Sequence, residues 1–355
     1  MYSEFFFIMH GDSMAITIKD VAKAAKVSVS TVSLVINNSS LVKFETKYKV
    51  QQVIKELNFT PNQNARSLVT NTKRVIGVVL TTKNVSANWF SFESHADTYM
   101  SEILPSIEKE INESNYSMML EHYLVNDDTT FSPSIMNSNK VDGMLVTGGI
   151  VSDEAFQRIQ ESNIPIVLVG SRYFNLDFVD TDPELGIYKS TKYLVENGHK
   201  DIVFINGPDY SQSSERKLKG FYRAMEEYDL PIRDKWVAQT EYSGAGGYRT
   251  ISHMWDMNIR PTAIVGGFDC ISLGALRFLY EKGLSCPKDI SVIGFEDNIL
   301  AEFSYPPLTT VRVHKERIGI EACKTLLNRI NKPNAKKVKL IIEPDLIIRG
   351  SVRQI

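Results

Sequence analysis

Two adjacent carboxylates in the second half of the chain could take part in acid–base chemistry. Glu296 and Asp297 follow the apolar run 292–295. A glycosidase places its two carboxylates on either side of one bond, about 5 to 9.5 Å apart. Side chains of neighbouring residues diverge, so this pair does not meet that requirement. The pair therefore does not favour a glycosidase.

Other enzyme motifs are incomplete or absent. Residues 214–217 read Ser-Glu-Arg-Lys and match the S-x-x-K pattern, but neither S-D-N nor K-T-G accompanies it. The sequence contains no H-E-x-x-H, no G-x-S-x-G, no strand-linked G-x-G-x-x-G and no phosphate-binding G-x-x-x-x-G-K-[ST]. We therefore expect a protein without enzymatic activity and without a cofactor.

The three cysteines, Cys270, Cys286 and Cys323, are an odd number at wide spacing. This spacing argues against both a disulfide framework and a metal site. We expect them to be small buried side chains in a protein of the reducing cytoplasm, with no bound metal.

Length and composition place the chain among ordinary globular proteins. Its residues are 43% apolar and 23% charged. A chain of 355 residues is too long for one compact core, so two or three domains are expected. No apolar run reaches the roughly 20 residues that span a bilayer, so a transmembrane protein is excluded. The run 5–8 lacks the features of a secretion signal, and we interpret residues 1–14 as a leader or cloning remnant.

Charge is divided unevenly along the chain. Residues 15–74 contain eight Lys and two Arg but only three acidic residues, a formal charge of +7, whereas residues 75–355 carry −7. A basic head on an acidic body is typical of a protein whose head neutralises phosphates, although a solvated basic face would give the same count.

The head must position its charges on short helices. Thr17 and Asp20 form a capping-box-like start, followed by one apolar stripe of Ile18, Val21, Ala22 and Ala25. Ser28 can cap a second helix, with Val32, Val35 and Ile36 facing the core and Val29, Ser30, Ser33 and Leu34 pointing elsewhere. A third stripe consists of Val50, Val53, Ile54 and Leu57. The pattern predicts a three-helix unit.

Two short helices joined by a tight turn fit helix-turn-helix docking into a major groove, because the second helix presents small and hydroxyl side chains outward. Helical hairpins also occur in proteins that never touch DNA. The positive charge of this segment favours the DNA-binding interpretation.

The same residues carry a family resemblance. The runs 17–25 and 27–33, the pair 37–38 and the segments 61–62 and 65–68 closely resemble the head of the lactose-repressor (LacI/GalR) family of bacterial transcription regulators. The resemblance continues through the body, from residue 17 to residue 349.

The resemblance implies where DNA would be bound. It places DNA contacts on Thr17, Ser28, Val29, Ser30, Thr31, Ser33, Leu34, Asn37, Asn62, Arg66 and Leu68. Val29, Ser30 and Leu34 match the base-reading positions. Leu34 stands where the family most often has Arg; it can pack on a thymine methyl but cannot bind guanine bidentately, so we expect an unusual operator half-site. Lys26 replaces a turn residue that is usually Gly or Asn.

A fourth, very short helix is expected from Thr60 and Pro61 to Leu68. About eight residues form a marginal helix in water, so this element should be conditional. In the family this hinge helix, within the linker 61–74, pairs with its dimer mate and inserts a leucine into the minor groove. Leu68 matches that leucine, although it could instead be a plain contact between linker and core.

From residue 75 onward, short apolar runs alternate with helical stretches. The runs are 75–80, 116–120, 143–147, 165–169, 202–206, 263–265 and 291–295. This alternation predicts parallel sheets with helices on both faces, and about 280 residues require two lobes.

The body resembles the family's effector-binding core, which is similar to periplasmic sugar-binding proteins of type I. By that resemblance the chain crosses between two Rossmann-like lobes near 181, 313 and 342. The expected N-lobe is 75–180 with 314–342, and the C-lobe is 181–313 with 343–355, after a helix-turn-helix head at 15–60. A ligand would lie between the lobes, where strand ends converge.

The resemblance also implies the ligand contacts, which are Trp89, Phe90, Arg216, Tyr242, Phe268, Asp269, Glu296 and Asp297. Phe268 and Glu296 depart from lactose-type members and suggest a different ligand. Plainer roles remain open: Arg216 could pair with Glu215 or Asp209 on the surface, and Tyr242 could be packing. We assign His199, after a helix that ends at Gly198, a structural role.

These inferences predict a homodimeric transcriptional regulator that binds a near-palindromic operator in double-stranded DNA. We expect a repressor of carbohydrate-use genes, controlled by a small carbohydrate. Two alternatives are a catabolite regulator that responds to a phosphocarrier protein and a purine-type, corepressor-dependent repressor. A stand-alone binding protein would lack the basic head. Candidate dimer contacts are Ile103, Ile107 and Ile111 on the first body helix and Leu273, Leu276 and Tyr280 on a later one.

Overall fold

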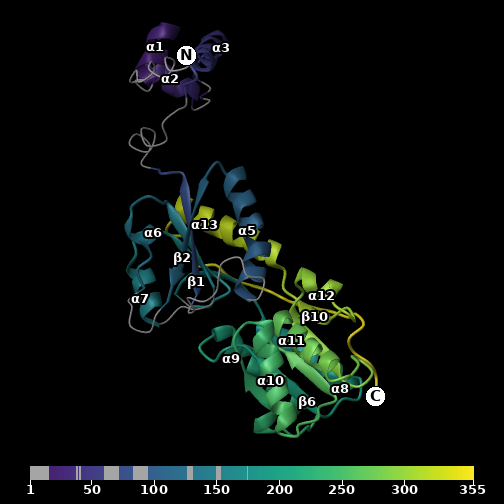
Figure 1. Ribbon diagram of the computed structural model, residues 1–355. Coiled ribbons are helices and arrows are strands. Elements are labelled where there is room, and N and C mark those ends of the chain that lie inside the picture. The colour runs from purple at the N-terminus through teal and green to yellow at the C-terminus, as the bar shows by residue number, and fades with distance from the viewer. Residues whose placement is uncertain are drawn as a thin grey trace, which may run out of the picture. The chain divides into compact units, whose positions relative to one another are not determined.

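A computed structural model describes residues 16–36, 39, 41–59, 72–82, 95–125, 131–148, 153–173 and 175–355. The chain divides into two compact units, Met1–Lys73 and Arg74–Ile355 (Figure 1). Several predicted features lie outside the described residues: the segment 1–14 that we interpret as a leader or cloning remnant, Asn37, the residues Asn62, Arg66 and Leu68 of the expected hinge helix, and the aromatic pair Trp89 and Phe90. No helix within the described ranges is long and apolar enough to cross a membrane.

The described part of the first unit contains three helices, α1 (Ile18–Ala25), α2 (Val29–Ile36) and α3 (Phe44–Glu56). Their shared core consists of Val21, Ala22, Ala25, Val32, Val35, Val50 and Phe59. The predicted stripes on all three helices are therefore confirmed as core-facing. α1 ends at Lys26, which adopts a left-handed conformation with φ 52° and ψ 48°. A lysine thus takes the backbone conformation that glycine adopts most easily.

The first sheet of the body has the strand order β11-β5-β4-β3-β1-β2, with all neighbours parallel. The strands are β1 (Val75–Thr82), β2 (Ser117–Leu124), β3 (Gly143–Thr147), β4 (Ile166–Val169), β5 (Asp177–Thr181) and β11 (Lys339–Ile342). The helices α5 (His95–Glu113) and α13 (Lys315–Asn331) share one core with it, and α6 (Ser134–Asn137) and α7 (Asp153–Glu161) share another. Helices therefore cover both faces.

The second sheet has the order β12-β10-β9-β8-β6-β7, parallel except at β12. Its strands are β6 (Ile202–Asn206), β7 (Val237–Gln239), β8 (Ala263–Gly266), β9 (Ser291–Glu296), β10 (Thr309–Arg312) and β12 (Asp345–Ile347). The helices α8 (Pro183–Glu196) and α9 (Gln212–Glu227) share one core with it, and α10 (Gly244–Asp256) and α11 (Asp269–Glu281) share the other. The short elements η1 (Asp234–Trp236) and α12 (Ile299–Phe303) complete this lobe.

The chain passes between the two sheets three times. It leaves the first sheet after β5, returns after β10, and leaves it again after β11 to form β12. The predicted fold class, a helical head followed by two α/β lobes, is confirmed. We call the part built on the first sheet the N-lobe and the part built on the second sheet the C-lobe.

One of the two predicted sets of dimer contacts is wrong. Ile103, Ile107 and Ile111 on α5 are fully buried in the N-lobe core, where α5 packs against α13. The two helices approach closely at Gly319, where an added Cβ would lie 2.1 Å from Ser106 Oγ. The apolar stripe on α5 faces a helix from the far end of the sequence, which local periodicity could not reveal.

His199 has the structural role expected of it. It is buried, its Nδ1 lies 3.1 Å from Thr262 Oγ1, and its Nε2 lies 3.1 Å from the carbonyl oxygen of Arg353. Burial lowers the pKa of His199. The neutral imidazole therefore fixes the last residues of the sequence to the C-lobe.

Candidate functional site

The outward face of α2 is the first candidate site. Val32 and Val35 are buried, whereas Val29 and Leu34 are 40% and 37% exposed and Ser30 is exposed as well. The helix therefore presents two apolar side chains and a hydroxyl away from the head's core. These are the three residues that we predict to read bases.

Hydroxyl side chains hold the starts of the first two helices. The Asp20 carboxylate accepts hydrogen bonds from the backbone N–H and the hydroxyl of Thr17, at 2.9 and 2.7 Å. These bonds lower the pKa of Asp20. Ser28 Oγ accepts a bond of 3.0 Å from the N–H of Thr31 and lies 2.8 Å from its hydroxyl. Thr17, Ser28 and Thr31 thus have capping roles beside any contact with DNA.

The described part of the head carries its basic side chains at the surface. The exposed lysines are Lys19, Lys23, Lys26, Lys43, Lys49 and Lys55. Exposed ammonium groups suit contacts with phosphates, which position a protein on DNA without reading its sequence.

The second candidate site lies where strands of the two lobes end. Asp180 is the residue before the last in β5, Glu296 is the last residue of β9, and Phe268 follows β8. Arg216 and Lys217 lie on α9, which follows β6. Ligands of open α/β sheets bind at such carboxyl ends. We call this group of residues the cleft site.

An ion pair joins the two lobes at the cleft site. Arg216 Nη1 lies 2.6 Å from Asp180 Oδ2, and Arg172 Nε lies 2.8 Å from the same oxygen. The surface pairing considered for Arg216 is therefore wrong, because Glu215 pairs with Lys219 instead. Among the described residues, no acceptor lies within bonding distance of the buried Arg216 Nη2. This nitrogen can still donate to a ligand oxygen.

Lys217 is a residue that sequence reasoning missed. Its side chain is fully buried, and its Nζ donates a hydrogen bond of 2.7 Å to the carbonyl oxygen of Gly267. The same Nζ lies 3.2 Å from the ring centroid of Phe268 and 3.9 Å from that of Phe295. Burial lowers the pKa of Lys217 to about 7, although the negative charge of Glu296 acts to raise it. The sequence does hold a clue to its burial, because Lys217 is spaced along α9 with the buried residues Ser214, Phe221, Ala224 and Met225.

Aromatic rings line the C-lobe side of the cleft site. Phe268 is buried, and its ring meets that of Tyr242 edge-on, at 86° and 4.5 Å between centroids. Burial raises the pKa of Tyr242 to about 12, so its hydroxyl stays protonated. That hydroxyl lies 3.5 Å from Ser214 Oγ.

Tyr99 on α5 is an N-lobe residue close to the cleft site. Burial raises its pKa, and the negative charges of Asp180 and Glu296 act in the same direction. Its hydroxyl lies near Gly170, at the end of β4. Tyr99 was not predicted either, because it lies five residues into a helix whose start the sequence does not mark clearly.

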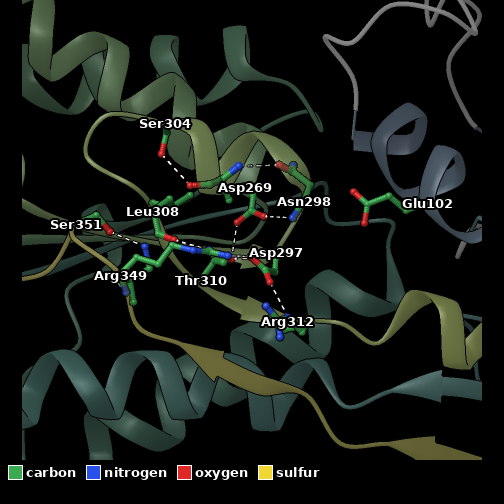
Figure 2. A network of polar contacts seen from close by, with 12 residues as sticks. Glu102, Asp269, Asp297, Asn298, Ser304, Leu308, Thr310, Arg312, Arg349 and Ser351 are labelled. Carbon is green, nitrogen blue, oxygen red and sulfur yellow. Dashed lines mark hydrogen bonds and ion pairs between the residues drawn. The ribbon is translucent and has the colours of Figure 1, made fainter.

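Asp269 and Asp297 belong to a hydrogen-bonded network beside the cleft site (Figure 2). Asp269 accepts bonds from the N–H of Asn298 and the hydroxyl of Thr310, at 2.8 and 2.5 Å. Burial raises the pKa of Asp269 to about 7, although both bonds oppose the rise. Asp297 accepts bonds from Arg312 and Arg349. Protein groups thus bond to two of the three carboxylates that we predicted to contact the ligand, those of Asp269 and Asp297.

Comparisons with known proteins agree with this architecture. The family profile described as bacterial regulatory proteins, lacI family, matches residues 17–62, and that of the periplasmic binding protein-like domain matches residues 191–352. The HTH-type transcriptional repressor PurR of Actinobacillus pleuropneumoniae serotype 3 (strain JL03) is 34% identical over 344 residues, which cover 96% of this chain and 99% of that protein. The protein of the same name from Histophilus somni (strain 129Pt) is 35% identical over 341 residues, 95% and 99% of the two chains.

Solved structures show the same fold. A lac repressor dimer bound to operator and the anti-inducer ONPF matches with a TM-score of 0.82 and 24% identity, over 95% of this chain and 99% of that one. A complex of the transcriptional regulator CelR with cellobiose matches with a TM-score of 0.70 and 26% identity, over the same shares. Relatives that are repressors thus align with almost the whole sequence, and the chain belongs to the LacI/GalR family of DNA-binding transcriptional repressors.

Proposed function

We propose that this repressor binds its operator as a homodimer and that a small molecule between the two lobes controls the binding. The observation that carries the proposal is the meeting of Asp180, Arg216, Lys217 and Glu296 at the cleft site. Buried charges cost free energy unless they are paired or bind something, so a cluster drawn from both lobes favours a ligand site.

Control would act through the separation of the lobes. A ligand that prefers one arrangement of the lobes shifts the population toward it and changes how the linker 61–74 is held. To change operator occupancy a hundredfold, the ligand needs about 2.7 kcal/mol of differential binding between the two states.

The first candidate ligand is a carbohydrate. Arg216 Nη2 and the Lys217 ammonium can donate to hydroxyl oxygens, and Glu296 can accept from hydroxyl groups. Phe268 and Tyr242 supply aromatic surface beside them. The similarity to the CelR–cellobiose complex supports this candidate.

The second candidate ligand is a purine. Relatives of 34 to 35% identity that share nearly the full length carry the name PurR. An aromatic surface with donors and an acceptor at its edge also fits a nitrogen heterocycle. A purine acting as corepressor would strengthen operator binding, whereas a carbohydrate inducer would weaken it.

Operator binding in the presence of single compounds would test the proposal. The operator is first selected from random duplexes with the full chain, and its dissociation constant is then measured with cellobiose, glucose, ribose, hypoxanthine and guanine. A change of tenfold or more with a sugar or a purine identifies the class. If only an added phosphocarrier protein changes the affinity, control by a small molecule is wrong.

A matched pair of variants separates ligand contact from folding. We expect Arg216→Gln to abolish the response, since it removes both the interlobe ion pair and the free donor. Arg233→Gln breaks a surface ion pair with Asp201 in the same lobe and should leave the response unchanged.

The homodimer would form through an apolar surface on the C-lobe. Tyr280 on α11, Phe303 on α12 and Tyr305 are 83%, 77% and 97% exposed, and α11 contacts α12. Large exposed aromatic side chains in one region mark interaction surfaces. A lac repressor dimer of the same fold supports a second copy as the occupant.

Sedimentation of Phe303→Glu would test this surface. We expect the variant to sediment as a monomer at micromolar concentration, because a carboxylate cannot be buried between two apolar faces. Met257→Glu, at another exposed apolar position of the same lobe, is the control and should remain dimeric. A dimeric Phe303→Glu protein would place the interface elsewhere.

A further inference from the structure

The turn after β9 combines a cleft residue with an unusual backbone. Glu296 has φ +116° and the next residue, Asp297, has φ +54°. Non-glycine residues rarely adopt positive φ, and two in succession persist only where the surroundings hold them. The side chain of Glu296 lies at the cleft site, so whatever holds this turn also places Glu296.

The Asp297 carboxylate helps to fix the conformation of this turn. Its Oδ2 accepts a hydrogen bond of 2.7 Å from Arg312 Nε, and its Oδ1 accepts one of 2.6 Å from Arg349 Nη2 (Figure 2). The side chain of Asp297 is only 6% exposed. With an arginine on each oxygen and little exposed surface, Asp297 is poorly placed to accept hydrogen bonds from a ligand.

The two arginines come from two different passages of the chain between the lobes. Arg312 is the last residue of β10, after which the chain enters the N-lobe. Arg349 follows β12, after the chain has returned to the C-lobe, and its Nη1 also donates to the carbonyl oxygen of Leu308. Asp297 therefore bonds to segments that flank two of the three passages.

The backbone of the turn is fixed separately. The N–H of Asn298 donates to Asp269 at 2.8 Å, and the N–H of Val313 donates to the carbonyl oxygen of Glu296 at 3.3 Å. A displacement of Glu296 thus reaches the passage after β10 through Val313. Through Asp297 it reaches the passages after β10 and after β11.

We propose that Asp297 is a positioning residue that links Glu296 to two of the interlobe passages, and that it is not itself a ligand contact. In this role it carries a change at the cleft site to the segments that set the separation of the lobes. The inference deepens the proposed function and, in its operator-binding part, rests on it.

Hydrogen exchange of the full chain without any ligand tests the link directly. In Asp297→Asn we expect exchange at least tenfold faster in segments 296–299, 309–315 and 345–350, with β6 and β8 unchanged. The control is Asp345→Asn. Asp345 lies opposite Arg312 in the pairing of β10 with β12 and bonds to His314 at 3.0 Å, so it joins the same two passages without touching the turn. It should leave segment 296–299 at the wild-type rate.

Two outcomes would overturn the inference. One is faster exchange of Asp297→Asn in 296–299 alone, with both passages unaffected. The other is the same acceleration of all three segments in Asp345→Asn. If Asp297→Asn does not fold, Arg312→Gln replaces it, because Arg312 is about half exposed and its loss breaks only one of the two bonds. It should speed exchange in 296–299 and 309–315 but not in 345–350, and wild-type rates throughout would refute the link.

Operator binding provides the functional readout. We expect Asp297→Asn to bind the selected operator about tenfold more weakly while its affinity for non-operator DNA is unchanged, and Asp345→Asn to match the wild type. Equal affinity of the Asp297 variant and the wild type for operator would remove the functional role. If no compound changes the operator affinity of the wild type, the proposed control fails, but the exchange experiment still decides the link.

Discussion

Lys217 is a charged residue in a buried environment that opposes its charge. An ammonium group buried over two aromatic rings gains cation–π attraction and one hydrogen bond, but loses its hydration. The lowered pKa of about 7 indicates that the loss of hydration is the larger effect. Under the proposed function, contact with a ligand would compensate for this loss.

This balance predicts a pH dependence of stability. The unfolded lysine keeps its proton up to about pH 10.4, whereas the folded one loses it near 7. Between these values the unfolded state binds more protons, so stability from this group rises with pH, by about 2 kcal/mol from pH 7 to pH 9.

The variant Lys217→Met isolates this contribution. It keeps the contact with Phe268 and Phe295 but cannot titrate, so the wild type should gain stability relative to it across that range. Urea unfolding of both proteins at pH 7 and pH 9 measures the difference, in which contributions of the other groups cancel. An unchanged difference would show that Lys217 keeps its proton in the folded protein.

At the scale of elements, sequence reasoning succeeded where a pattern is local. The caps and apolar stripes of the head and the seven apolar runs of the body were enough to predict the three described head helices and seven strands. The strands β5, β7, β10, β11 and β12 were not predicted as strands. All but β5 have only three or four residues, which carry little periodicity. The stripe on α5 was placed at an interface because its partner, α13, lies about 210 residues away.

The residues of the cleft site were also predicted only in part. Matches to the family identified Arg216, Tyr242, Phe268 and Glu296, which lie at or beside it. They missed Lys217 and Tyr99, whose roles depend on burial between elements distant in sequence. They also included Asp269 and Asp297, whose carboxylates bond to protein groups that only the folded chain brings close.

The turn between α1 and α2 allows a test at the scale of elements. Lys26 adopts a positive φ, and its N–H bonds to the carbonyl oxygen of Lys23. Lys26→Gly should stabilise the head by roughly 1 kcal/mol, because glycine has no Cβ to crowd in this conformation. Hydrogen exchange of the head within the full chain measures the gain. Lys26→Ala loses the same charge without relieving the backbone, and equal behaviour of the two variants would show that the turn is not strained.

At the scale of the whole molecule, the division of charge governs association with DNA. A head of +7 attached to a body of −7 should bind through the head and repel phosphates elsewhere. Release of counterions makes such binding steeply dependent on salt.

We therefore expect operator affinity to fall about a thousandfold between 50 and 200 mM monovalent salt, if the dimer makes roughly six phosphate contacts. Fluorescence anisotropy with a labelled operator gives the slope of the logarithm of the affinity against the logarithm of the salt concentration. Replacing the exposed Lys49 with Gln should reduce the slope if that side chain contacts a phosphate. An affinity that is insensitive to salt would contradict binding by the basic head.

The three passages between the lobes also determine how this chain can be divided by cloning. A fragment that stops after β5 would lack β11 and α13, and the isoleucines of α5 would face water. A fragment that starts at α8 would retain those two elements without the sheet that they complete. Neither lobe is a contiguous stretch of sequence, so an isolated lobe would require joining separate gene segments through a designed connection.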